Sequence, residues 1–219
     1  MSKIMASEKL GVAIHGAGWV AGAHALAWIK NPHIEVVSVS DIDLDRAKRF
    51  AEANGLRCSI RDRYDEVLAD DRVDVVDITG PSHVHAEQAI AAAEAGKHVL
   101  VEKPIALTMD ENRALRDAVA RAGVKSVTSF VSRFNEQVVT LKSLLQSGAV
   151  GDLFYAEVDY WHGIKPTHHA WRLHSRKETG GSAMLLAGCH AVDTLRWLVG
   201  DEVEEVAAEQ ELRQERSEH

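Results

Sequence analysis

The stretch Leu10-Gly11-Val12-Ala13-Ile14-His15-Gly16-Ala17-Gly18-Trp19-Val20-Ala21 decides the fold. It predicts an apolar strand over 10–14, a glycine turn, and a helix over 19–30 with a helical apolar period. In this context Gly16 permits a tight turn, and Gly18 lets the backbone approach a pyrophosphate. The N-terminus of the following helix offers unpaired N–H groups to phosphate. The turn is therefore a candidate dinucleotide site.

Asp41 strengthens this prediction, which a lone pair of glycines supports only weakly. It ends the second predicted strand, 23 residues after Gly18, near the place of the acid that binds the ribose 2′-hydroxyl. Its charge would repel a 2′-phosphate, so NAD is favoured over NADP. Asp43 could take the same role, and Asp41 could instead cap the next helix. Ala21, at the place of the third glycine of the fingerprint, still allows close helix packing.

Strand-length apolar runs alternate with helical segments up to residue 131. This alternation predicts an α/β fold, in which a doubly wound parallel sheet of the Rossmann type is covered on both faces. We assign the domain to residues 1–130. The predicted strands are 10–14, 34–39, 58–60, 73–79, 98–101 and 124–131, and the predicted helices are 19–30, 44–54, 64–69, 82–95 and 109–122.

The pattern changes near residues 129–134, which we take as a domain boundary. Two strands are few for a sheet with a covered face. We therefore expect residues 131–219 to form a partial α+β domain, apparently truncated, for substrate binding or oligomerisation. A partner chain could complete it, which makes a homo-oligomer the expected assembly. The predicted elements are a helix over 136–146, a strand over 153–161, a His-rich basic loop over 163–181, a helix over 182–199 and a strand over 203–207.

Composition narrows the class of protein. Of 219 residues, 46% are hydrophobic and 26% charged, which is typical of a soluble globular protein. The net charge of −8 argues against a nucleic-acid partner. Cys58 and Cys189 form no disulfide framework or zinc motif, which favours a cytoplasmic location. Residues 11–29 lack charged side chains, but their glycines and their change from strand to helix pattern argue against a membrane span.

Glu102-Lys103-Pro104 follows the fifth predicted strand. Ligands of open α/β sheets bind beyond the carboxyl ends of the strands, so Lys103 can face the cleft. There its amine could exchange a proton with a substrate hydroxyl or carbonyl group. The alternative is a surface lysine, the commoner fate of this residue type. Pro104 fixes the turn and could follow a cis bond.

Several motifs together resemble the Gfo/Idh/MocA family, which includes glucose–fructose oxidoreductase and inositol dehydrogenase. The resemblance extends from Gly11 to Gly200, and Glu-Lys-Pro after Gly-Lys-His-Val is its most specific part. The matching pieces are Gly16-Ala17-Gly18 with His24, Ser40-Asp41, Pro81-Ser82-His83-Val84-His85-Ala86-Glu87, Ala95 through Pro104, Ser132-Arg133-Phe134-Asn135, Trp171-Arg172, Gly180-Gly181 and Gly188-Cys189-His190-Ala191-Val192-Asp193.

This resemblance implies an NAD(P)-dependent oxidoreductase that transfers a hydride between nicotinamide and a sugar, a polyol or a related compound. It implies that Lys103 is the catalytic lysine and that His190 joins it as a proton relay or hydroxyl ligand. The cofactor-binding residues that we expect are Gly16, Gly18, Trp19, Val20, Asp41, Pro81, His85, Glu102 and Lys103. The substrate-binding residues that we expect are Lys103, Arg133, Trp171, Arg172, His190 and Asp193.

The chain also departs from the family pattern. Many members carry an aspartate where this chain has Leu186, four residues before His190, so the usual Lys–Asp–His relay cannot form there. Asp193 could substitute for it, or could hold a loop. Gly80 stands where a threonine is common, and family members continue well beyond residue 219. A non-catalytic dinucleotide-binding module, or an inactive fragment, is therefore the alternative to an enzyme.

The histidines of the 163–181 region are the remaining candidates. His162, His168, His169 and His174 lie among basic residues and lack the carboxylate support of a metal site. We expect no metal there, and a substrate-facing or merely solvated loop instead.

Overall fold

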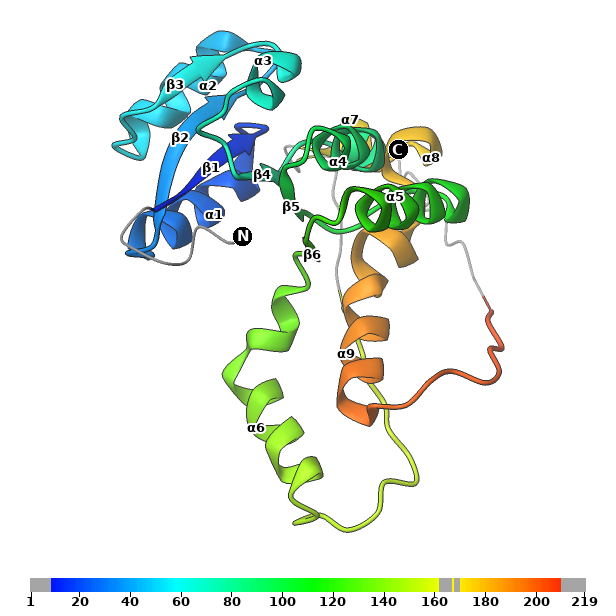
Figure 1. The fold of residues 1–219 in the computed structure, drawn as a ribbon. Helices are drawn as coiled ribbons and strands as arrows, with labels where there is room; N and C mark the ends of the chain where they lie inside the picture. The colour runs from blue at the N-terminus through cyan, green and yellow to red at the C-terminus, as the bar shows by residue number, and fades with distance from the viewer. Residues whose placement is uncertain (1–8, 162–166, 168–169, 210–219) are drawn as a thin grey trace.

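The computed structural model of the protein describes residues 9–161, 167 and 170–209. Figure 1 shows a strand-and-helix layer at the N-terminal end, from which helices and a long loop depart after β6. The strands are β1 Leu10–His15, β2 Ile34–Ser40, β3 Ser59–Arg61, β4 Val75–Ile78, β5 His98–Val101 and β6 Ser126–Thr128. The helices of this layer are α1 Trp19–Lys30, α2 Leu44–Ala53, α3 Tyr64–Leu68, the 3₁₀ turn η1 Ser82–Val84, α4 His85–Glu94 and α5 Met109–Ala122.

The six strands form one sheet in the order β3-β2-β1-β4-β5-β6, and every neighbouring pair is parallel. This order confirms the doubly wound Rossmann fold that the sequence predicts. The first three strands are added in one direction from β1. After β3 the chain crosses back and adds β4 on the other side of β1, so the strand order reverses between β1 and β4. In such sheets the crevice beyond the carboxyl ends at the reversal is where ligands bind. The Gly16 turn follows β1 directly, so it lies at this crevice.

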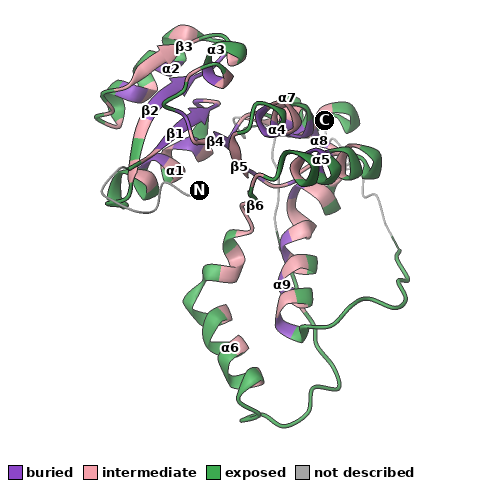
Figure 2. Cartoon of the chain, in the orientation of Figure 1, coloured by how far each residue is buried: buried purple, intermediate pink, exposed green. Residues whose placement is uncertain are grey.

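Side chains alternate along β1, so the strand contributes to the core on both faces of the sheet. Val12 and Ile14 pack with α1 and α2, whereas Ala13 packs with residues of α4 and α5. Figure 2 shows the buried residues concentrated on the central strands and on the helix faces against them. The cluster on the α1 and α2 face consists of Val12, Ile14, Ala17, Ala21, Ala25, Val39 and Ala47.

The rest of the chain is helical where it has regular structure. Its elements are the 3₁₀ turn η2 Val131–Phe134, α6 Glu136–Gln146, α7 Trp171–His174, α8 Lys177–Gly180, the π-helical turn η3 Met184–Gly188 and α9 Cys189–Val199. Helix α6 has no buried residue, and Figure 2 shows it largely exposed beside α9. The long helix predicted over 182–199 thus divides into a π-turn and an α-helix. Part of the predicted loop over 163–181 forms α7 and α8.

The strand predictions for 153–161 and 203–207 are wrong. Neither segment forms a strand in the described residues. Alternating polarity can assign the faces of a strand, but a strand also needs a neighbour to bond its N–H and C=O groups. No described segment supplies that neighbour, and Phe154 and Trp161 are 97% and 92% exposed.

The charge-free segment 11–29 comprises β1, the glycine turn and most of α1. Of the helices in the described part of the chain, none has the length and apolarity required to span a membrane.

Candidate active site

The glycine turn between β1 and α1 has the geometry that a pyrophosphate site needs. Gly16 has φ +101°, and a Cβ there would lie 2.6 Å from the Gly80 nitrogen, so only glycine fits. At Gly18, the N-cap of α1, a Cβ would meet nothing closer than 4.0 Å, so its Cα face is open. Among the described residues no side chain caps α1, and its first turn carries no acid. This helix end therefore suits an anionic ligand.

Asp41 is buried directly behind this turn. Its Oδ2 accepts a hydrogen bond from the Ala17 N–H at 2.8 Å, and its Oδ1 accepts one from the Asp43 N–H at 2.9 Å. Arg46 also places Nη2 3.1 Å from Oδ1. Helix α2 is capped by Asp43, whose side chain accepts from the Arg46 N–H. Asp41 thus braces the glycine turn, and the cap that we considered for it falls to Asp43.

His15, the last residue of β1, is a buried neutral group beside the turn. Its Nδ1 lies 2.7 Å from Ser40 Oγ, and its ring stacks on Tyr64 at 4.1 Å between centroids. Burial lowers the pKa of His15 to about 4, although the negative charge of Asp41 opposes the shift. The ring therefore adds no positive charge beside the glycine turn near neutral pH.

Lys103 follows β5 and reaches across to the second part of the chain. Its Nζ donates a hydrogen bond to the Leu186 carbonyl oxygen at 2.8 Å. Leu186 lies within η3, where the wider π-turn interrupts the regular helical bonding pattern. The lysine is half-buried, and the Lys103–Pro104 bond is cis. Lys103 is therefore bonded to the main chain of the residue at which many family members carry an aspartate.

His190 lies one turn beyond Leu186, in the first turn of α9. Its side chain is buried between aromatic residues: the ring stacks on Tyr160 at 5.3 Å and meets Phe130 edge-on at 6.2 Å. Nδ1 lies 3.5 Å from Ser132 Oγ. The structure thus joins α9 to the segment after β6 through His190.

Asp193 pairs with Arg133 and with neither Lys103 nor His190 in the described contacts. The Arg133 guanidinium donates from Nε to Oδ2 at 2.7 Å and from Nη2 to Oδ1 at 2.5 Å, which is a bidentate pair. Both carboxylate oxygens of Asp193 are occupied in this way. Of the two roles considered for Asp193, the structure favours holding the η2 segment over replacing the missing aspartate.

The loops above the crevice contain the remaining predicted residues. Pro81 is exposed and precedes η1, and helix α8 packs against η1. His85 is only 1% exposed, with Nδ1 2.7 Å from the Pro104 carbonyl oxygen and Nε2 2.9 Å from that of Gly80. Burial lowers the pKa of His85 despite both carbonyls, so the neutral ring donates to one of them at a time. His85 thus links the loop at Gly80 to the loop at Pro104.

The 170–181 region carries the last predicted residues. Trp171 is half-buried and Arg172 exposed in the short helix α7. Gly180 is required by close contact, since a Cβ there would lie 2.6 Å from the His174 carbonyl oxygen. Gly80, in contrast, has room for a side chain, because its Cβ would meet only Gln88 and Val84 atoms at 3.7 and 3.9 Å. His162, His168 and His169 lie outside the described residues.

Sequence reasoning missed a buried ionic network beneath Lys103. His24 Nδ1 lies 2.9 Å from Asp77 Oδ1, and His24 Nε2 lies 3.0 Å from Glu102 Oε1. The indole N–H of Trp28 donates to Asp77 Oδ2 at 2.6 Å. The signal was present: Asp77 is an acid inside the apolar run of β4, and a fully buried carboxylate requires partners.

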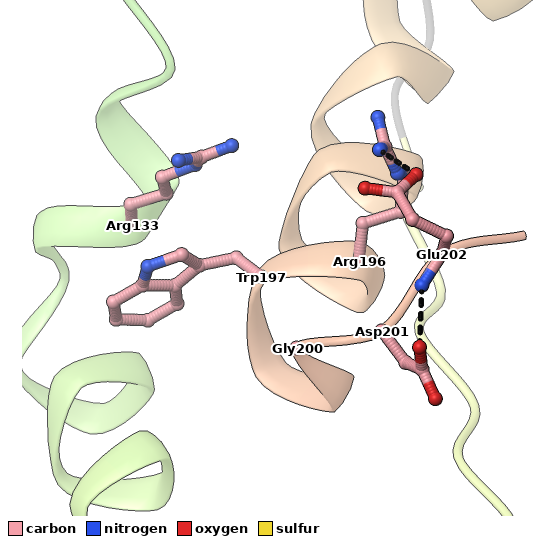
Figure 3. Close-up of a pocket in the computed structure, with 6 residues that line it drawn as sticks. All are labelled: Arg133, Arg196, Trp197, Gly200, Asp201 and Glu202. Carbon is pink, nitrogen blue, oxygen red and sulfur yellow. Dashed lines mark hydrogen bonds and ion pairs between the residues drawn. The ribbon is translucent and has the colours of Figure 1, made fainter.

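A separate pocket of about 240 Å³ lies at the C-terminal end of α9, away from Lys103. Its lining residues are Arg133, Arg196, Trp197, Gly200, Asp201 and Glu202, and Figure 3 shows their side chains. Both arginines are already paired, Arg196 with Glu202 at 2.8 Å and Arg133 with Asp193. We assign no role in the chemistry to this pocket.

Comparison with known protein families matches both parts of the chain. Residues 10–130 match the Gfo/Idh/MocA model described as an oxidoreductase family with an NAD-binding Rossmann fold. Residues 138–218 match the Gfo/Idh/MocA C-terminal domain. The chain is 32% identical over 209 residues to levoglucosan dehydrogenase of Pseudarthrobacter phenanthrenivorans, and 32% identical over 205 residues to inositol 2-dehydrogenase of Rubrobacter xylanophilus.

These alignments cover 89% and 91% of the chain but only 52% and 55% of the two relatives. The chain thus spans about half the length of the curated relatives that it matches. Among solved structures, a levoglucosan dehydrogenase in complex with NADH and levoglucosan superimposes with a TM-score of 0.81 at 31% identity. That match covers 89% of this chain and 55% of the other. The chain belongs to the Gfo/Idh/MocA oxidoreductase family and carries its NAD-binding Rossmann domain.

Proposed function

We propose that this chain provides the NAD site and the proton-transfer lysine of an oxidoreductase acting on the hydroxyl or carbonyl group of a sugar or polyol. The observation that carries the proposal is the position of Lys103. It follows β5 beyond the carboxyl edge of the sheet, and its amine is anchored 2.8 Å from the Leu186 carbonyl. The related levoglucosan dehydrogenase and inositol 2-dehydrogenase support the substrate class.

The glycine turn and Asp41 would hold the cofactor. The open face at Gly18 and the uncapped N-terminus of α1 suit the pyrophosphate, with Trp19 and Val20 in the first helical turn. Asp41 lies at the position for the adenosine ribose and carries the charge that disfavours a 2′-phosphate. Bound NAD supplies a hydride acceptor or donor at nicotinamide C4. Pro81, His85 and Glu102 belong to the loops that border its crevice.

The proton would move through Lys103. In the oxidative direction its neutral amine takes the proton of the substrate hydroxyl group, and in the reductive direction its ammonium form returns the proton to the carbonyl oxygen. The Leu186 carbonyl oxygen accepts one N–H of the amine, and this bond orients the other N–H groups or the lone pair of the nitrogen. His190, one turn along the same helical segment, is the proposed proton relay or hydroxyl ligand.

Four residues complete the proposed substrate side. Arg133 and Asp193, as a bidentate pair, fix the η2 segment against α9, where Ser132 meets His190. Trp171 and Arg172 lie in α7, next to α8, which packs on η1 at the crevice. The Arg133–Asp193 pair and helix α7 both belong to the proposed domain 131–219, which follows the Rossmann domain 1–130.

Two assays on the full chain test the proposal. NADH binding is followed by nicotinamide fluorescence, and turnover by NADH absorbance with a panel of sugars and polyols. We expect Lys103→Ala to lower turnover by roughly 10²- to 10⁴-fold, the range for a lost general acid or base, with NADH affinity nearly unchanged. Lys103→Arg is the matched control, because it keeps the charge without an amine of comparable acidity, and should be equally slow. Full activity of Lys103→Ala would refute the assignment.

We also propose a cytoplasmic homo-oligomer. Cys58 and Cys189 are both free thiols, in keeping with a reducing compartment. The apolar side chains that 131–161 exposes, including Phe134 and Phe154, favour association with a second copy.

A further inference from the structure

His24 joins three elements at the buried base of the crevice. It lies in α1, the helix that starts at the glycine turn, and its ring stands between Asp77 of β4 and Glu102 after β5. The side chains of His24 and Glu102 are 10% exposed, and that of Asp77 is fully buried. Such a buried network is stable only when every member is satisfied.

Glu102 links this network to Lys103. Its Oε1 contacts His24, and its Oε2 accepts the main-chain N–H of Lys103 at 3.1 Å. A side-chain hydrogen bond with Ser129, just after β6, adds a further contact. Lys103 is therefore held twice: at its main chain by Glu102, and at its tip by the Leu186 carbonyl.

The contacts of His24 require a doubly protonated ring. Each ring nitrogen faces a carboxylate at 2.9–3.0 Å, and a neutral imidazole would turn one lone pair toward a negative oxygen. Burial alone lowers the pKa of His24, but the hydrogen bonds and charges of Asp77 and Glu102 outweigh burial and raise the pKa to about 10. The imidazolium thus separates two carboxylates that would otherwise repel each other.

We propose that His24 is a positioning residue for Lys103: the imidazolium, clamped between Asp77 and Glu102, holds Glu102 in the conformation that fixes the main chain of Lys103 at the end of β5. The role presupposes the proposed function of Lys103 in proton transfer. The cofactor and the substrate are not contacted by His24 in this role.

Two substitutions divide the contacts of His24 between them. The amide nitrogen of asparagine stands close to the place of histidine Nδ1, so His24→Asn keeps the bond to Asp77 and loses the bond to Glu102. The amide nitrogen of glutamine stands close to the place of Nε2, so His24→Gln keeps the bond to Glu102 and loses the bond to Asp77. Both variants lose the charge, so their comparison sets the loss of the contact with Glu102 against the loss of the contact with Asp77.

We expect His24→Asn to lower kcat by about 10- to 100-fold, with KM for NAD nearly unchanged, as for other losses of an outer support or of alignment. His24→Gln should retain clearly more of the wild-type kcat. Equal losses in the two variants, or a larger loss in His24→Gln, would overturn the proposal. Trp28→Phe is the control, because it removes the other bond to Asp77 at 2.6 Å without touching Glu102. It should lower thermal stability and leave kcat unchanged.

A second measurement does not depend on turnover. Competitive acetylation of the full chain, read by mass spectrometry, gives the reactivity of Lys103 relative to the exposed Lys125. We expect the ratio to change in His24→Asn and in Glu102→Gln but not in Trp28→Phe. An unchanged ratio in both of the first two variants would refute the positioning role. If the wild type turns over no sugar or polyol while the ratio changes as expected, the proposed function fails and the positioning of Lys103 stands. If the His24 variants do not fold, Glu102→Gln alone decides by the same ratio.

Discussion

Asp41 shows how one carboxylate can bind three neighbouring residues. One oxygen holds the Ala17 N–H of the glycine turn, and the other meets Asp43 and Arg46. The side chain is buried, so these charge-assisted bonds form with little competition from water. The position that the sequence assigns to ribose recognition is therefore also a brace for the phosphate turn.

This double role leads to a prediction for Asp41→Ala. We expect NADH affinity to fall by about 10- to 100-fold, since a hydrogen bond to a charged group contributes roughly 1.5–3 kcal/mol. NADPH affinity should fall less, because the charge that opposes its 2′-phosphate is also lost. Fluorescence titration with both cofactors measures the two changes.

Asp41→Asn provides the matched control for the Asp41→Ala prediction. Its amide oxygen can still accept from Ala17, so it keeps the brace and removes the charge. An equal loss of NADH and NADPH affinity in Asp41→Ala would show that the residue does not discriminate at the ribose.

At the scale of elements, the Rossmann part was predictable because its signals are local. The strand, the Gly16 turn and the helix adjoin in sequence, and the period of α5 can be read within one window. Thr108 and Glu111 form a capping box at the start of α5, a pair three residues apart that is also a local signal. The strand prediction for 153–161 was wrong because a strand needs a neighbouring strand, and local alternation of polarity carries no information about one.

The site was predictable to the same extent. The glycines, Asp41 and Lys103 belong to contiguous motifs, whereas the partners of His24 lie 53 and 78 residues away. Contacts over such separations depend on the order of strands in the sheet. The carbonyl of Leu186 leaves no trace in the sequence, because every residue has one.

The contacts of His24 with Asp77 and Glu102 should make the free energy of unfolding depend on pH. The pKa of His24 is about 10 in the folded chain against an ordinary value of 6.5. Its stabilisation is therefore complete below about pH 6.5 and is lost as pH rises through 10. Between these values one bound proton corresponds to about 1.4 kcal/mol per pH unit. Urea unfolding at pH 7, 8 and 9 measures the slope.

The double variant His24→Gln/Asp77→Asn is the control for this slope. It removes the imidazolium and the carboxylate of Asp77 together, so that Asp77 is not left as a buried charge without its partner. We expect its stability to fall less steeply with pH than that of the wild type. Identical slopes would mean that His24 takes up no proton on folding.

At the scale of the whole molecule, the chain has a well-packed half and an exposed half. The sheet has a hydrophobic cluster on each face, whereas α6 buries no side chain. Val131, Phe134, Phe154 and Trp161 are each at least 60% exposed. Exposed apolar side chains of this size, gathered in one part of the sequence, favour an interface over a solvent-facing surface.

We therefore expect the purified chain to associate as its concentration rises. Analytical ultracentrifugation measures the distribution of species. Phe154→Ser with Trp161→Ser should shift it toward the monomer, whereas Ile42→Ser, an exposed apolar change at the Rossmann end, should leave it unaltered. A monomer at every concentration would contradict the proposed oligomer.

The anchor of Lys103 has an evolutionary consequence. Its acceptor is a backbone oxygen in a widened helical turn, so amino-acid replacement at position 186 does not delete it. A side chain at position 186 has to fill a buried space, and leucine does so. A lineage could thus dispense with an acidic side chain at this place while its lysine kept a fixed orientation throughout.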